Sequence, residues 1–187
     1  MPNPIGRALR NNRAGQDALI WALPGLNAPQ TLTVTSPAFA PGEPIPREYR
    51  GRLFGPNPSP ELEWTQAPAG TVELVLIVQD PDAPRRQPAT HLVTRGIGPE
   101  LRGVPEGGLA QPSPIPGLVH GKGALGHRGW AGPMPVPSHG PHVYVFQLFA
   151  LDRRLDLPDP FTLRQAVDAM SGHVIARGRL DGTYEIP

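Results

Sequence analysis

Two long apolar segments constrain the fold of this chain more than any other feature. Residues 72–79, VELVLIVQ, are almost continuously apolar and rich in β-branched side chains. Residues 142–151, HVYVFQLFAL, alternate so that His142, Tyr144 and Phe146 share one face of a strand. The first pattern predicts a central strand buried on both faces, and the second predicts another strand of the same sheet.

Segments rich in proline and glycine separate these strands. The chain has 27 prolines and 22 glycines among 187 residues, and proline interrupts both helices and strand ladders. Shorter strands are expected at 31–36 and 90–94, a turn-rich connection at 55–60, and a long loop at 96–141. A loop of that length inside a compact domain is usually functional or contains short strands. The expected fold class is therefore mainly β, with long loops stiffened by proline.

Few helices are predicted, and all are short. Thr162 and Gln165 have the spacing of a capping box, and apolar residues repeat at helical intervals from Leu163 to Val174. Asn3 before Pro4 has the pattern of an N-cap followed by a first-turn proline. These patterns predict one helix near each end of the chain.

The chain is expected to divide at residue 30. Residues 1–30 are predicted to be an N-terminal extension with a short helix and an arm, and residues 31–187 to be the main domain. The apolar side chains Ile5, Leu9 and Trp21 are unsuited to a free tail. We expect the extension to pack against the core or against a second copy of the chain, so a homodimer is an open alternative.

Composition excludes several classes of function. The formal net charge is +1, from 17 basic and 16 acidic residues, so no strong field attracts nucleic acid. The absence of cysteine excludes disulfides, zinc–thiolate sites and a thiol nucleophile. The apolar stretch Ala18–Leu23 is too short for a secretion signal, and no run approaches transmembrane length. We expect a cytoplasmic protein with no nucleic-acid partner and no transmembrane segment.

Four polar residues are the candidates for a binding site. Asp80 follows the predicted central strand and opens a turn with prolines at 81 and 84, and His91 lies on the next predicted strand. His142 and Tyr144 share one face of an apolar strand, so they need hydrogen-bond partners if that face is buried. Imidazole and phenol donate hydrogen bonds to oxygen anions, and a neighbouring carboxylate favours the protonated imidazole. The set predicts a pocket for an anionic, phosphate-like group.

The remaining histidines are weaker candidates. His120, His127 and His139 fall in the long loop, where exposure to solvent is the simpler expectation. Lys122 stands between two glycines, a pattern typical of a flexible loop tip rather than of a phosphate-binding loop.

Familiar enzyme templates are absent from the sequence. There is no Gly-x-Ser-x-Gly elbow, no His-Glu-x-x-His pattern and no dinucleotide-binding glycine motif. Asp80, His91 and His142 could form a two-histidine, one-carboxylate metal site, so a metal-dependent or water-activating hydrolase is the alternative hypothesis. We expect a binding protein without enzymatic activity, and no cofactor or bound metal.

Several motifs follow one another along the chain: Ser36–Phe39, Gly55–Trp64, Ala67–Thr71, Asp80–Pro84 with His91, Gly129–Pro135, Pro141–Asp152 and Leu180–Tyr184. In this order and spacing they resemble the phosphatidylethanolamine-binding protein family, in its bacterial Raf-kinase-inhibitor-like branch. The resemblance covers residues 31–186 and leaves 1–30 outside.

The resemblance implies a fold and a site. The fold is a Greek-key β-sandwich with a few small peripheral helices. By position, the anion pocket is formed by Asp80, His91, His142 and Tyr144, with Pro84 and Pro133 on its walls. The resemblance also implies a cis peptide bond between Ala83 and Pro84.

The function implied by the resemblance is that of a binding module. It captures a small phosphate-bearing or other anionic ligand, and some members of the family regulate or inhibit a kinase or a protease, which makes a protein partner an expectation here. Leu92, Val143 and Gly123 depart from the residues usual in this branch. These departures affect the expected ligand preference and partner surface rather than the pocket itself.

Overall fold

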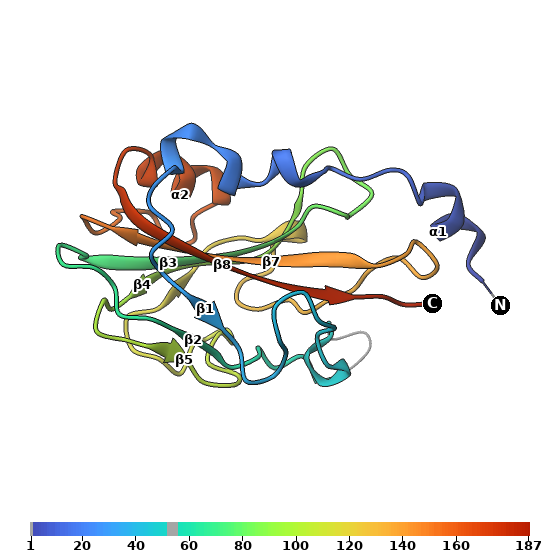
Figure 1. Ribbon diagram of the computed structural model, residues 1–187, viewed down its shortest axis with the longest axis horizontal. Helices are drawn as coiled ribbons and strands as arrows, with labels where there is room; N and C mark the ends of the chain where they lie inside the picture. Colours follow the sequence, from blue (N-terminus) through green and yellow to red (C-terminus); the bar gives the residue numbers. More distant parts are fainter. Residues whose placement is uncertain (1, 52–55) are drawn as a thin grey trace.

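The computed structural model describes residues 2–51 and 56–187, and its centre is a five-stranded antiparallel sheet (Figure 1). The strand order is β6 (Val119–His120), β4 (Ala89–Ile97), β3 (Glu73–Asp80), β7 (His142–Leu151) and β8 (Val174–Tyr184). All eight residues of β3 are buried, as continuous apolar patterning predicts. β3 pairs directly with β7, so the prediction that the two apolar segments share one sheet is confirmed.

A second, smaller sheet covers one face of the large sheet. It contains β1 (Val34–Thr35), β2 (Leu62–Trp64) and β5 (Gly103–Val104), in that order. Tyr144 and Phe146 of β7 point into the apolar core on this side, where Trp130 stacks on Phe146. The fold is therefore mainly β with two sheets, which confirms the predicted fold class.

The opposite face of the large sheet is covered by helical elements. α2 (Leu163–Met170) packs there, together with three single 3₁₀ turns, η1 (Gln16–Ala18), η2 (Ile20–Ala22) and η3 (Pro24–Leu26). The capping box between Thr162 and Gln165 is present as predicted. α2 ends earlier than its apolar periodicity predicts, because Val174 already belongs to β8.

The N-terminal residues pack on the core of the same chain. Leu19 and Leu26 are buried, and the Trp21 ring lies between Phe149, at 6.0 Å between ring centroids, and the Arg177 guanidinium, 4.1 Å above the ring. Further upstream, α1 (Pro4–Leu9) begins at the predicted N-cap, where the Asn3 side chain accepts from two backbone N–H groups. The domain boundary at residue 30 and the homodimer remain predictions.

The loops contain more structure than the sequence predicts. The segment 96–141 holds β5, β6 and the 3₁₀ turn η5 (Ala124–Gly126), and a further 3₁₀ turn, η4 (Arg47–Tyr49), lies between β1 and β2. The expected strand at 31–36 is reduced to β1, and β8 is much longer than the expected terminal strand. Gly55, the first residue of one family motif, lies outside the described residues.

The predicted cis bond before Pro84 is wrong. The cis X–Pro bonds of the described residues are Gln111–Pro112 and Asp159–Pro160. The Asp80 carboxylate accepts from the backbone N–H groups of Asp82 and Ala83, so a side chain builds this turn with the ordinary trans bond.

No helix in the described part of the chain is long and apolar enough to cross a membrane. A cytoplasmic location remains a prediction.

His120 is buried in β6, contrary to the expectation that it is exposed. Its Nε2–H donates to the Ala110 carbonyl at 3.0 Å, so its Nδ1 accepts from the Thr94 hydroxyl at 2.6 Å. The ring is 1% exposed, and burial lowers its pKa from 6.5 to about 4, with Arg128 adding to the effect. On protonation Nδ1 would become a donor, and the Thr94 hydroxyl would have to rotate to accept from it.

This histidine predicts a loss of stability in acid. Below pH 6.5 the His120 ring is protonated in the unfolded chain, but in the folded chain it stays neutral until about pH 4. The free energy of unfolding therefore falls as the pH falls through this window. The shift corresponds to roughly 3 kcal/mol. Urea unfolding of the parent and of His120→Gln at pH 7 and pH 4.5 should show a smaller acid loss in the variant. An equal loss of stability in the parent and in His120→Gln would contradict the prediction. His173→Gln, which changes a more exposed ring, serves as the control and should keep the parent's acid loss.

Candidate functional site

Asp80 joins the end of β3 to the start of β7. Its Oδ1 accepts from the N–H groups of Asp82 at 2.8 Å and Ala83 at 3.0 Å, and its Oδ2 lies 2.8 Å from Nδ1 of His142. Asp80 is 3% exposed and His142 is 1% exposed. Asp80 therefore holds the His142 imidazole through a buried hydrogen bond.

The second nitrogen of His142 is also engaged. Its Nε2 lies 2.7 Å from Nδ1 of His139, and Nε2 of His139 donates to the Leu9 carbonyl at 2.8 Å. His139 is fully buried, so the expectation that it is exposed is wrong. Both ring nitrogens of His142 therefore hold protein groups, and a direct contact from His142 to a ligand remains a prediction.

His91 and Tyr144 lie beside each other on β4 and β7. Their rings meet edge to face, with centroids 5.0 Å apart. Nδ1 of His91 donates to the Ala131 carbonyl at 2.7 Å, and its Nε2 has no hydrogen-bond partner among the described residues. The buried Tyr144 hydroxyl also lacks such a partner within residues 2–51 and 56–187. Unlike His142, these two side chains retain polar atoms that a ligand could use.

The environment shifts the pKa values of both groups. Burial lowers the pKa of the His91 imidazole, although Asp80 partly opposes this shift. Burial raises the pKa of the Tyr144 phenol well above 10, and the negative charge of Asp80 adds to the rise. The Met134 backbone is near enough to oppose that rise, but it does not reach hydrogen-bonding geometry with the hydroxyl. Near neutral pH the phenol is a donor, and His91 favours its neutral form.

The segment 130–134 holds His91 in place. Ala131 both accepts from the His91 ring and donates its N–H to the His91 carbonyl. Asn57 holds this segment, because its side chain donates to the Trp130 carbonyl and accepts from the Gly132 N–H. Only glycine fits at 132, where a Cβ would lie 2.0 Å from the Tyr49 carbonyl oxygen. Sequence reasoning placed Asn57 in a family motif but gave it no role.

The two predicted wall residues flank the site. Pro133 is buried within the segment 130–134, and its carbonyl accepts from the Gly51 N–H at 2.9 Å. Pro84 is half-buried at the end of the turn that Asp80 holds. Their contact with a ligand remains a prediction.

Two other loop residues make contacts that the sequence does not predict. The partly buried His127 ring lies within hydrogen-bonding distance of the Ala124 and His91 carbonyls, so it belongs to the surroundings of His91. Lys122 is exposed as expected, but its backbone N–H donates to the Phe161 carbonyl, which ties this segment to the start of α2.

The alternative metal site gains no support from the geometry. Within the described residues, no group of three histidine, aspartate or glutamate side chains is arranged to hold a metal ion. His142 would have to release Asp80 or His139 to become a ligand.

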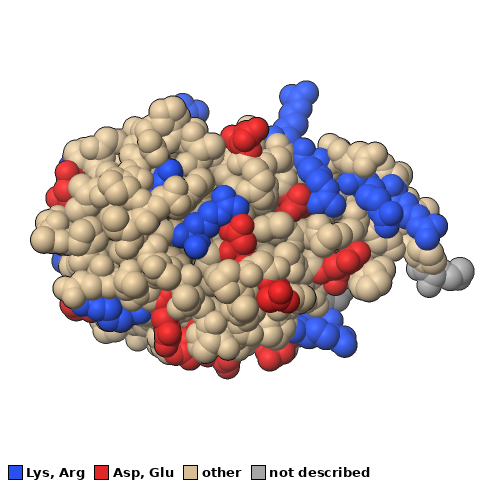
Figure 2. Space-filling model, in the orientation of Figure 1, with Lys and Arg blue, Asp and Glu red and all other residues tan. Residues whose placement is uncertain are grey.

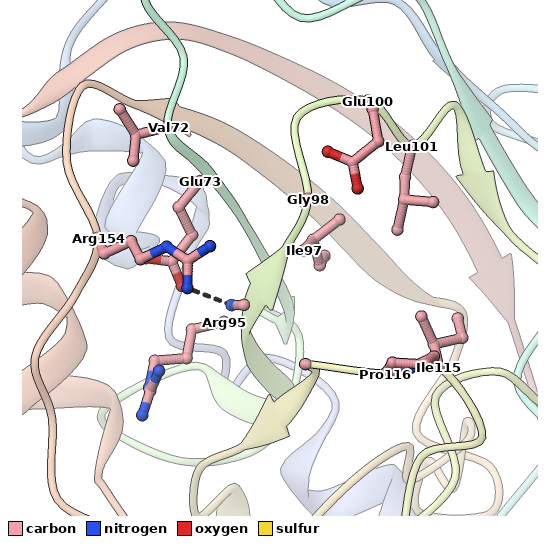
Figure 3. Close-up of a pocket in the computed structure, with 12 residues that line it drawn as sticks. Val72, Glu73, Arg95, Ile97, Gly98, Glu100, Leu101, Ile115, Pro116 and Arg154 are labelled. Carbon is pink, nitrogen blue, oxygen red and sulfur yellow. Dashed lines mark hydrogen bonds between the residues drawn. The ribbon is translucent and has the colours of Figure 1, made fainter.

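Two hollows help to locate the site. A groove of about 500 Å³ borders it, since its lining includes Ala131 and His127, which bond to His91. A second cavity, of about 390 Å³, lies around Glu73 at the opposite end of β3 (Figure 3). Asp80 lies seven positions after Glu73 along the strand, a distance of roughly 23 Å. The Glu73 carboxylate is already held by the N–H groups of Gly96 and Leu155, which makes it a structural group.

Comparison with known proteins identifies the family. Residues 35–185 match the model of the family named phosphatidylethanolamine-binding protein. LppC of Mycobacterium tuberculosis, which carries the name of a lipoprotein, is 37% identical over 84% of this chain and 74% of its own. The chain belongs to the phosphatidylethanolamine-binding protein family.

Solved structures agree with this assignment. CT736 of Chlamydia trachomatis, described as a homologue of this family, is 34% identical, with a TM-score of 0.74 over 83% of this chain and 98% of its own. YbcL of E. coli, described as a member of the mammalian family, is 26% identical, with a TM-score of 0.76 over 83% of this chain and 99% of its own. These structures share the two-sheet fold.

The buried Asp80–His142 pair predicts a large cost for its disruption. Asp80→Asn should lower the free energy of unfolding by roughly 3 to 5 kcal/mol, because it leaves a buried imidazole without its carboxylate. Asp152→Asn is a matched control: Asp152 pairs with His173 at 3.0 Å, but both side chains are at least 36% exposed, and the loss should stay below about 1 kcal/mol. Urea unfolding at pH 7 measures both, and equal losses would contradict the assigned role of Asp80.

Proposed function

We propose that the protein binds an oxyanion that carries a proton, such as hydrogen phosphate or a phosphate monoester, at the Tyr144 hydroxyl and the Nε2 atom of His91. The observation that carries this proposal is the buried Tyr144 hydroxyl, which has no partner in the described chain. An unsatisfied buried polar group costs about 1 to 3 kcal/mol, and a bound anion would remove that cost. Such groups are rare in folded proteins.

The tautomer of His91 specifies the ligand further. A carbonyl oxygen only accepts, so the proton of neutral His91 is on Nδ1, facing Ala131. Its Nε2 is then an acceptor, and it repels a fully deprotonated anion unless the ring gains a second proton. A ligand with a P–OH group can instead donate to Nε2 while another of its oxygens accepts from Tyr144.

The site binds without catalysing a reaction in this proposal. His142 does not contact the ligand in this proposal, because Asp80 and His139 occupy its two ring nitrogens and fix its orientation. Regulation of a kinase or a protease, which the family resemblance implies, remains a prediction and concerns a surface outside this site.

Tyr144→Phe tests the proposal directly. The variant should be at least as stable as the parent, because it removes a buried group without a partner. Its affinity for inorganic phosphate should fall about ten- to a hundredfold, the equivalent of one hydrogen bond to a charged group. Calorimetric titration at pH 7 measures the affinity, and urea unfolding measures the stability.

Tyr49→Phe is the matched control. The Tyr49 hydroxyl donates to Glu106 at 2.7 Å, away from the site, so this variant should lose stability and keep its phosphate affinity. Unchanged phosphate affinity in Tyr144→Phe would overturn the proposed function.

The anions should also differ in their pH dependence. Sulfate has no proton to donate in this range, so it requires protonated His91, whose pKa is lowered by burial. Sulfate affinity should therefore rise as the pH is lowered, by up to about tenfold per unit, because one proton is taken up with each anion. Phosphate affinity should have a shallower dependence and persist at neutral pH. Titrations of both anions from pH 7.5 to pH 5 check this, with His173→Ala as a control, and parallel curves would contradict the assigned tautomer.

A further inference from the structure

A continuous chain of hydrogen bonds links the site to the N-terminal segment. It runs from Asp80 to His142 (2.8 Å), from His142 to His139 (2.7 Å) and from His139 to the Leu9 carbonyl (2.8 Å). Leu9 is the last residue of α1 and lies outside the part of the chain that matches the family. The chain of hydrogen bonds therefore joins the candidate site to a segment outside the part that matches the family model.

The number of protons in this chain follows from its two ends. The Leu9 carbonyl and an ionised Asp80 only accept hydrogen bonds. Three hydrogen bonds need three protons, but two neutral imidazoles supply two. One additional proton must be present, and the pair formed by His139 and His142 then carries one positive charge, which balances Asp80.

Burial strengthens this requirement. His139, His142 and Asp80 are at most 3% exposed, and a buried set of groups is tolerated when its charges cancel. The other titratable groups around the pair are Asp82 in the turn, His91 on β4 and the neighbouring Tyr144, with Tyr184 on β8 and Arg13 from the N-terminal segment. Arg13 pairs with Asp82, so those two charges cancel as well.

The N-terminal segment docks on the same loop and turn at several points. Asn3 N–H donates to Ser138 Oγ at 2.9 Å, and Arg13 bonds to Asp82 at 2.6 Å and to the Pro141 carbonyl at 3.0 Å. Figure 2 shows cationic side chains gathered over α1 and the segment that follows it. Arg7 and Arg10 are exposed there, which leaves them open to a protease.

We propose that residues 3–13 form a clasp whose docking is coupled to the additional proton of the His139–His142 pair. His139 is the positioning residue of the clasp. Its Nε2 donates to the Leu9 carbonyl, and its Nδ1 accepts from the protonated form of His142. Loss of the proton breaks one of the three bonds, loosens the clasp and removes a positive charge beside the anion site. The link to ligand binding rests on the proposed function, whereas the clasp itself does not.

Limited digestion of the full-length protein with trypsin tests the clasp. The ratio of cleavage after Arg10 to cleavage after Arg86 corrects for the pH dependence of trypsin, since Arg86 lies in an exposed turn. In the parent this ratio should rise as the pH is raised. The rise should coincide with the loss of one ring proton from His142 in ¹⁵N spectra. A constant ratio, or titration of His142 without a change in the ratio, overturns the proposal.

Three variants separate coupling from simple destabilisation. His139→Ala should have a high ratio that no longer changes with pH, because the bond to Leu9 is absent. His139→Gln should restore a low ratio at pH 6, since an amide can both accept from His142 and donate to Leu9. His120→Ala removes another buried loop histidine that does not touch the clasp, and it should keep the parent's pH dependence.

A pH-dependent ratio retained in His139→Ala, or lost in His120→Ala, would overturn the coupling. No anion enters this experiment. Failure of the phosphate titrations therefore overturns the proposed ligand and leaves the clasp standing, and the reverse holds for failure here.

Discussion

The bond between Asp80 and His142 is the interaction on which the site and its surroundings depend. One carboxylate ends the most buried strand, holds the turn after it and pairs with the first residue of the neighbouring strand. These tasks are compatible because a carboxylate accepts several hydrogen bonds, and donors on both oxygens offset its desolvation. The turn, the strand pairing and the imidazole orientation therefore depend on one buried charge.

Three of the buried or partly buried histidines around β4 and β7, His120, His91 and His142, differ through their partners rather than through their chemical type. His120 is held neutral between a hydroxyl and a carbonyl, and His91 has its proton directed away from its free nitrogen. His142 lies between a carboxylate and a second imidazole, so both of its ring nitrogens are engaged. The identity of each hydrogen-bond partner thus determines which ring can receive a ligand and which responds to pH.

The N-terminal segment has two physical roles in one continuous stretch. Its 3₁₀ turns complete the apolar layer on one face of the large sheet, where Trp21 packs against Phe149 and Arg177. Its first residues reach the end of the sheet where Asp80 and His142 meet. The packed turns therefore anchor the segment, while the polar contacts upstream of them depend on hydrogen bonds and charge.

The sequence by itself determined the elements whose signals are local. The strands around 72–79 and 142–151, the capping box at Thr162 and the N-cap at Asn3 follow from side-chain period and from contacts within a few residues. The order of motifs also indicated the family and the four polar residues near the sheet end. Only the tertiary structure decided that His139 is buried against His142, because its second partner is the carbonyl of Leu9, 130 residues away along the chain. The tautomer of each histidine and the hydrogen-bonding atoms left without a partner depend on such distant residues. Local sequence patterns therefore cannot predict them.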